Sequence, residues 1–256
     1  MKYDAVHLVQ RVWQSNIRGT HYSGSLGLSP GFVLTHGEVC RTCNSELAFL
    51  DRSLIDDLDI VAFHSGVPRK HGRPPRIDSR GNMVGYHTTD GPVFAINMER
   101  HPVTTPEGVR VAAFSRSSRN IRAKLKKAGD EAQISYETSI GSSPVFARGI
   151  HKIALNSTAY FLGCEIALDP NLDYVRNYVR NDVGERRIIA LTTNDPEYRN
   201  TVWAPYRHKD GLSVVVRLAM VEFAVDLSPS QSAIPVLMAE LERTHGKSGW
   251  SLLPPV

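Results

Sequence analysis

The sequence has few cysteines and no long hydrophobic run. Its three cysteines, Cys40, Cys43 and Cys164, are an odd number, which argues against the disulfide framework of a small secreted protein. No apolar run approaches the roughly 20 residues that span a bilayer. The apolar stretch after Met1 is short and interrupted, unlike a signal peptide. We therefore expect a cytoplasmic protein of bacterial or phage type that has no membrane partner.

Several common enzyme motifs are also missing. The sequence contains no P-loop, no glycine fingerprint for a dinucleotide and no G-x-S-x-G elbow. It contains no internal repeat and no long low-complexity run. Ser142-Ser143-Pro144 is interpreted as the entry to a helix rather than as a nucleophile.

The composition is that of a protein able to bury a core. Of its 256 residues, 41% are hydrophobic and 22% are charged, and the formal net charge is +4. This length accommodates one large domain, or a small module followed by a domain of ordinary size. A mildly basic balance is compatible with nucleic acid or another anionic partner.

The most informative stretch runs from Val39 to Arg76. Cys40 and Cys43 form a C-x-x-C pair, a spacing at which two thiolates can bind one tetrahedral zinc ion. Asn44 follows at once and is a candidate helix N-cap. A helix is then predicted from an apolar stripe at steps of three and four residues, with most of the neighbouring aspartates off the stripe. The stripe consists of Leu47, Leu50, Leu54, Leu58 and Val61.

The predicted helix ends before Gly66, where a basic loop rich in proline and glycine begins. Its cations are Arg69, Lys70, Arg73 and Arg76, which we expect either to bind phosphate groups or to be solvated.

The remainder predicts a mixture of helices and strands. Helices are expected at 117–129, 144–163, 169–183 and 235–243, and strands at 109–114, 133–140 and 188–193. Hairpins are expected around Asp90-Gly91 and Asp210-Gly211. The helix at 117–129 would carry Arg119, Arg122 and Lys126 as a second basic surface for phosphates.

Two motifs, V-C-R-T-C-N-S-E-L-x-x-x-D and G-V-P-R-K-x-G-R-P-P-R, resemble the second half of an HNH (ββα-metal) endonuclease module. The subgroup resembled is a bacterial one in which a larger C-terminal region follows the nuclease motif. Proteins of that kind occur in bacterial DNA processing and in antiviral defence. The resemblance implies an α+β protein with a ββα-metal module at 1–76 and a mixed α+β domain at 77–256.

The family's functional residues carry over position by position. Asn44 matches the third motif residue, which holds or orients the metal, and Cys40 and Cys43 match the second pair of zinc ligands. Thr20-His21, followed by Leu26-Gly27, is the nearest match to the acid-histidine pair. The resemblance thus implies that His21 is the general base and that Mg²⁺ or Mn²⁺ is the catalytic cation.

The sequence departs from this pattern in three ways. Thr20 stands where the family has an acid, the spacing from His21 to Leu26-Gly27 is one residue short, and no cysteine precedes Cys40. Four cysteine ligands are therefore not present. Either His36 or His7 completes a mixed zinc site, or Cys40 and Cys43 are buried reduced thiols.

Other candidates also have a structural interpretation. His21 could be a turn residue, and Asn44 could be only a helix cap. Asp51 matches an acidic position of the family pattern, but a solvated helix residue or the partner of an arginine would look the same. Arg148, His151 and Lys152 cluster in one helix, where we expect His151 to be a surface residue.

Three hypotheses follow. The first is an HNH-type metal-dependent endonuclease acting on DNA, either active or with a decayed metal centre. The second is a non-catalytic nucleic-acid-binding subunit of a protein complex that kept the HNH scaffold. The third is a small-ligand sensor built on the C-terminal region, with the cysteine pair incidental.

Overall fold

The computed structural model covers the whole chain and describes part of it. The described residues are 41–64, 76–79, 83–88, 91–96, 103–104, 110–111, 113–115, 121–128, 131–138, 140–141, 143–192, 200–245 and 250–253. The chain is α+β, as expected. Among the described residues, no helix combines the length and the apolar character needed to cross a membrane.

The chain divides into two compact units. The first unit combines Met1–Leu54 with Gly141–Val256, and the second is Ile55–Ile140. The start of the long N-terminal helix thus groups with the C-terminal half of the chain. Contacts between residues about a hundred positions apart cause this grouping, and a sequence pattern cannot reveal them.

The first unit is built on an antiparallel sheet. Its strand order is β10-β12-β13-β9-β14, with β11 paired to β12. The strands are β9 (Ile188–Thr192), β10 (Thr201–Val202), β11 (Tyr206–His208), β12 (Gly211–Leu218), β13 (Val221–Asp226) and β14 (Trp250–Leu253). The predicted strand at 188–193 is confirmed.

The hairpin predicted at Asp210-Gly211 is confirmed, because His208 on β11 pairs with Gly211 on β12. Strand β12 ends at Leu218, and Ala219 follows it with a left-handed φ of 57°. Leu218 then pairs with Val221, so β12 and β13 form a second hairpin.

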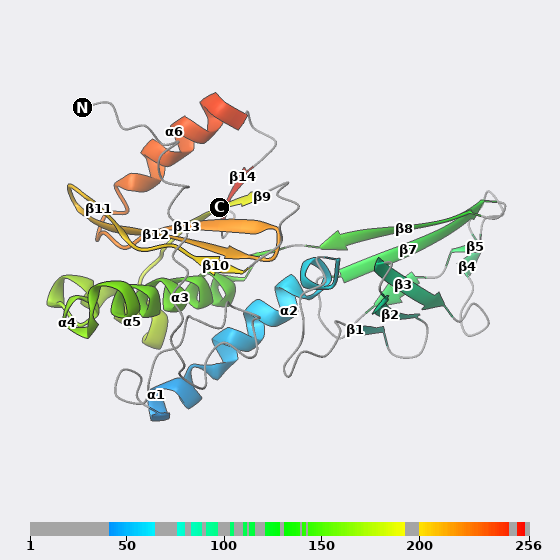
Figure 1. The fold of residues 1–256 in the computed structure, drawn as a ribbon, viewed down its shortest axis with the longest axis horizontal. Helices are drawn as coiled ribbons and strands as arrows, with labels where there is room; N and C mark the ends of the chain where they lie inside the picture. The colour runs from blue at the N-terminus through cyan, green and yellow to red at the C-terminus, as the bar shows by residue number, and fades with distance from the viewer. Residues whose placement is uncertain are drawn as a thin grey trace. The chain divides into compact units, whose positions relative to one another are not determined.

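One face of this sheet forms the core with helix α3 (Pro144–Leu162). Along β12, buried residues alternate with partly exposed ones, as in a strand with one covered face. Phe223 on β13 meets Phe146 on α3 edge to face, with ring centroids 5.4 Å apart. Helix α6 (Ala233–His245) lies on the other side of the sheet (Figure 1).

The helix predicted at 144–163 is confirmed at both ends. The Ser143 hydroxyl accepts a hydrogen bond from the Val145 amide at 3.2 Å, and Pro144 occupies the first turn. Gly163 ends the helix at a positive φ of 98°.

The helix predicted at 169–183 is confirmed as two elements. The Asp169 carboxylate caps a 3-10 turn (Pro170–Leu172), and α5 (Asp173–Asn181) follows. A short helix, α4 (Cys164–Ala167), precedes them. The helix predicted at 235–243 corresponds to α6.

The N-terminal helix is in two pieces, α1 (Arg41–Glu46) and α2 (Ala48–His64). Leu50, Leu54 and Leu58 of the predicted stripe are buried. The expected role of Asn44 as a helix N-cap is wrong, because Asn44 lies within α1. Asp57 of α2 is also buried.

The second unit contains only strands apart from the end of α2, among the residues described in it. The strands are β1 (Arg76–Ser79), β2 (Met83–Thr88), β3 (Gly91–Ile96), β4 (Val103–Thr104), β5 (Arg110–Val111), β6 (Ala113–Ser115), β7 (Ile121–Ala128) and β8 (Glu131–Thr138). They form sheets β1-β2-β3, β4-β5 and β6-β7-β8. The hairpin at Asp90-Gly91 is confirmed by the pairing of Thr88 with Gly91, and the strand at 133–140 by β8.

The helix predicted at 117–129 is wrong. Residues 121–128 form β7, which pairs with β6 and β8. The sequence alternates Ile121, Ala123 and Leu125 with basic residues, which is the period of a strand. The density of lysine and arginine, which are good helix formers, concealed this alternation.

Candidate functional site

Helix α1 places the motif residue Cys43 beside α5. The Arg180 guanidinium on α5 donates a hydrogen bond from Nη2 to the Cys43 sulfur at 2.8 Å, across 137 positions of sequence. A cationic donor favours the thiolate over the thiol, and the thiolate is the form that binds metals and acts as a nucleophile. One half of the cysteine pair is therefore held in an electropositive environment.

Asn44 follows on the same short helix. Its side-chain oxygen Oδ1 is enclosed and has no hydrogen-bond donor among the described residues. An enclosed amide oxygen without a donor costs free energy, and a bound cation, a water molecule or a ligand N–H would satisfy it. A hard divalent cation takes oxygen ligands of this kind.

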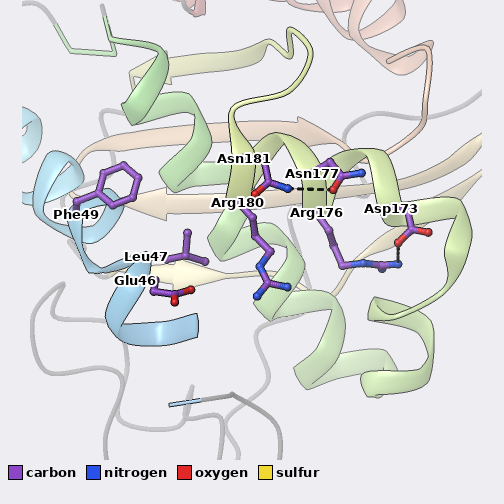
Figure 2. A pocket seen from close by; sticks show the side chains of 8 residues that line it. All are labelled: Glu46, Leu47, Phe49, Asp173, Arg176, Asn177, Arg180 and Asn181. Carbon is purple, nitrogen blue, oxygen red and sulfur yellow. Dashed lines mark hydrogen bonds and ion pairs between the residues drawn. The ribbon is translucent and has the colours of Figure 1, made fainter. Parts of the chain in front are cut away.

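A pocket of about 330 Å³ lies between α5 and the segment that joins the end of α1 to the start of α2 (Figure 2). One side consists of Glu46, Leu47 and Phe49. The other consists of the polar face of α5, namely Asp173, Arg176, Asn177, Arg180 and Asn181. Figure 2 shows Arg180 extending from α5 toward α1, so that one guanidinium both lines the pocket and contacts Cys43.

The polar face of α5 follows from its sequence. Val175, Tyr178 and Val179 are buried. The pocket residues are spaced three or four positions apart and therefore share the opposite face. The Asn181 side-chain amide donates from Nδ2 to the side-chain oxygen Oδ1 of Asn177 at 3.3 Å, one helical turn away.

The two arginines of this face have different roles. Arg176 pairs with Asp173, and its guanidinium also donates to the carbonyl oxygens of Ala167 at 2.5 Å and Asp169 at 3.0 Å. It thereby satisfies carbonyl groups at the end of α4. Arg180 is exposed and reaches into the pocket.

A buried network fastens α2 and α5 to α3. Lys152 on α3 forms an ion pair with Asp51 on α2 at 2.8 Å. Arg148, also on α3, donates to the Val179 carbonyl at 2.9 Å and lies 3.3 Å from the Asp182 carboxylate. Asp51 is therefore not a freely solvated helix residue, because its carboxylate pairs with Lys152.

The expectation that His151 lies on a helix surface is wrong, because its side chain is fully buried. Its Nδ1 lies 2.8 Å from the Ala147 carbonyl oxygen, and its ring meets Tyr178 edge to face. Burial, together with the Arg186 guanidinium, lowers the pKa of His151 to about 3, against the weaker effect of the Ala147 carbonyl. His151 is therefore neutral at physiological pH.

A second buried network surrounds Asp226. One carboxylate oxygen accepts a hydrogen bond from the Ser228 amide and the other from the Ala233 amide, each at 2.7 Å. His208 Nε2 lies 3.4 Å from the same carboxylate. These contacts fix the turn that leads into α6.

Several predicted site residues lie outside the described residues. These are Cys40, His21, Arg69, Lys70, Arg73 and Arg119, together with His7 and His36 as further zinc ligands. The two strands expected before the helix of a ββα module lie there as well. Arg76 is the first residue of β1, and Arg122 and Lys126 lie on β7 rather than on the expected basic helix.

Within the described part of the chain, no group of three or more histidine, cysteine or acidic residues could hold a metal ion. Cys43 and Asn44 are thus two candidate ligands whose expected companions, Cys40 and His21, are not described. The third cysteine, Cys164, is partly exposed at the start of α4.

The pocket residues Phe49, Asn177 and Asn181 were not predicted from the sequence. A signal was present, because polar residues recur at helical spacing from Asp173 to Asn181, opposite an apolar stripe. That pattern alone describes any solvated helix face, so the pocket depended on the neighbouring α1.

No protein-family model, no curated protein and no solved structure matches this chain. The functional argument therefore rests on the geometry of the site and on the motif.

Proposed function

We propose that this chain is an HNH-type nucleic-acid-binding protein that hydrolyses DNA phosphodiester bonds with a divalent cation. The observation that carries the proposal is the arrangement around Cys43 and Asn44. The Cys43 sulfur accepts a hydrogen bond from the Arg180 guanidinium, and the adjacent Asn44 oxygen is enclosed without a donor among the described residues. A thiolate suits zinc, and an amide oxygen suits a hard cation.

Each proposed role follows from the chemistry of the residue. His21 takes the proton from the attacking water, since an unperturbed imidazole titrates near neutral pH. Asn44 helps to hold Mg²⁺ or Mn²⁺, and Cys40 with Cys43 holds zinc. A bound divalent cation would neutralise charge on the scissile phosphate and on the leaving oxygen.

The basic residues position the nucleic acid backbone. Contacts from lysine and arginine to phosphate give affinity that is independent of sequence and falls steeply with salt. The residues proposed for this role are Arg69, Lys70, Arg73 and Arg76, with Arg119, Arg122 and Lys126 as a second set. The protein acts in the cytoplasm under this proposal.

Nicking of supercoiled plasmid in the presence of Mg²⁺ or Mn²⁺ tests the catalytic assignment. We expect His21→Ala to reduce the rate roughly 10²- to 10⁴-fold, the usual contribution of a general base. Asn44→Ala should reduce it as well, while Asn171→Ala, an exposed asparagine of the same unit, should not. No nicking by the unaltered protein, or nicking that survives both changes, contradicts the assignment.

A second function is supported by the departures from the family motif. Thr20 replaces the acid and no cysteine precedes Cys40, as expected in a subunit that binds nucleic acid without cutting it. DNA binding that weakens with salt, without nicking, would favour this alternative. Binding that is absent or indifferent to salt would contradict both functions.

Metal analysis of the purified protein tests the cysteine pair. Stoichiometric zinc that is lost in Cys43→Ser is expected if Cys40 and Cys43 are ligands. Protein that contains no zinc would leave the two cysteines as packing residues.

A further inference from the structure

We propose that the pocket between the start of α2 and the polar face of α5 holds one unstacked nucleobase of the bound nucleic acid. This inference rests on the proposed function and names the part of the ligand that the pocket takes. The pocket volume of about 330 Å³ lies at the small end of the range of about 300–1,000 Å³ found for small-molecule sites. It suits a single heterocycle and its sugar.

The charges of the pocket favour a base over a free phosphate. Its lining contains two guanidiniums, from Arg176 and Arg180, and two carboxylates, from Glu46 and Asp173. Arg176 is already bound to Asp173 and to carbonyl oxygens of the chain. A site for a free anion needs a clear excess of positive charge, and this pocket has none.

The polar groups match the edge of a base. Asn177 and Asn181 are exposed, and the bond between them uses one donor and one acceptor of their two amides. Each amide has two N–H donors and a carbonyl acceptor. An amide can therefore still pair with the donor and acceptor edge of a base, as asparagine does with adenine.

The aromatic ring needed for stacking is also present. The Phe49 side chain is 47% exposed, although it belongs to a helix whose leucine stripe is buried. The Arg148 guanidinium lies over this ring, 5.5 Å from its centroid, and is itself fixed by the Val179 carbonyl. Arg148 thus contacts one face of the Phe49 ring, and a base can stack on the exposed surface of the ring.

Arg180 links the pocket to the proposed metal site. Its guanidinium lines the pocket and donates to the Cys43 sulfur, and Asn44 adjoins Cys43. A base in the pocket would therefore belong to a nucleotide close to the phosphate that is cut. Extruding a base costs least in single-stranded or damaged nucleic acid, so the pocket would favour such substrates.

Binding of single-stranded DNA without divalent metal tests this inference apart from catalysis. We expect Phe49→Ala and Asn177→Ala to weaken binding about tenfold or more, with the salt dependence unchanged, because neither residue contacts a phosphate. Phe49→Tyr should restore the affinity. The matched controls are Asn171→Ala and Val236→Ala, an exposed asparagine and an exposed apolar residue away from the pocket.

A second measurement uses free nucleosides, which carry no phosphate. Saturation-transfer NMR should detect at least one of adenosine, guanosine, cytidine and thymidine on the unaltered protein and lose the signal in Phe49→Ala. Nucleoside binding by a protein that does not nick plasmid would support the pocket and contradict the nuclease. Nicking by a protein that binds no nucleoside, and whose pocket variants bind DNA normally, would overturn the pocket alone. Binding of inorganic phosphate that Arg180→Gln abolishes, without nucleoside binding, would make it an anion site and also overturn the inference.

Discussion

Two polar regions of the first unit differ in how their hydrogen bonds are used. In the networks on α3 and at the end of β13, the side chains of Arg148, Lys152 and Asp226 are buried and bound to carbonyl oxygens, amides or opposite charges of the chain itself. On the outer face of α5, Asn177 and Arg180 are exposed and line a pocket. Polar groups whose bonds are used internally stabilise the fold, whereas the exposed pocket groups remain able to bind a ligand.

This contrast predicts that variants of the buried region lower stability, while variants of the α5 face lower binding alone. The largest effect is expected for Asp226→Ala, which leaves the Ser228 and Ala233 amides without their acceptor. We expect a loss of about 3–5 kcal/mol in the free energy of unfolding, measured by urea denaturation. Asp210→Ala is the matched control, because Asp210 is exposed and accepts a hydrogen bond from Ser232. A loss below about 1 kcal/mol for Asp226→Ala would contradict the idea that the buried polar residues stabilise the fold more than the residues of the α5 face do.

The second effect is a dependence of stability on pH that comes from His151. The unfolded chain protonates this histidine below its ordinary pKa of 6.5, whereas the folded chain does so only near a pKa of about 3. Acid therefore favours the unfolded state throughout that window. Between about pH 7 and about pH 5, the native protein should lose about 2 kcal/mol more stability than His151→Phe, which keeps a ring and does not titrate. Parallel pH profiles of the two proteins would show that His151 is not buried as described.

A third, smaller effect on stability tests whether α2 packs against α3 at Gly149. A Cβ at Gly149 would lie 2.8 Å from the Leu54 side chain, so Gly149→Ala should cost about 1–2 kcal/mol after its gain in helix propensity. In a Leu54→Ala background the obstruction is gone, and the same change should be neutral or stabilising. Equal costs in both backgrounds would show that the two helices do not meet at this point.

The smallest change in stability is expected on the α5 face. Asn177→Ala and Asn181→Ala should each alter the free energy of unfolding by less than about 0.5 kcal/mol, since both side chains are exposed. Their effect should instead appear in nucleic-acid affinity. Thermal unfolding together with binding measurements checks this, and a large loss of stability would assign these residues to the structural region.

Much of the secondary structure was predictable because its signals are local. Ser143, Pro144 and Gly163 mark the ends of α3, and Asp210-Gly211 marks a hairpin, since each acts through its own backbone preferences. The strand β7 was missed where helix propensity and the two-residue period disagreed, and pairing with β6 and β8 decided the outcome.

The candidate site was predictable only in part. The C-x-x-C-N motif singled out Cys43 and Asn44, but no sequence pattern connects them with Arg180 or Phe49. The contact between Arg180 and Cys43 spans 137 positions, and that between Lys152 and Asp51 spans 101. No periodicity extends so far, so the partner of each charge depended on how the helices pack.

The sequence by itself determined the ends of α3 and the turn between β11 and β12, because capping and turn geometry act within a few residues. Only the tertiary structure decided which polar residues are enclosed and which line the pocket. His151 and Asn177 are both polar helix residues in the sequence, yet one is fully buried and the other lines a pocket. Burial depends on what packs against a helix face, and that is fixed by distant segments of the chain.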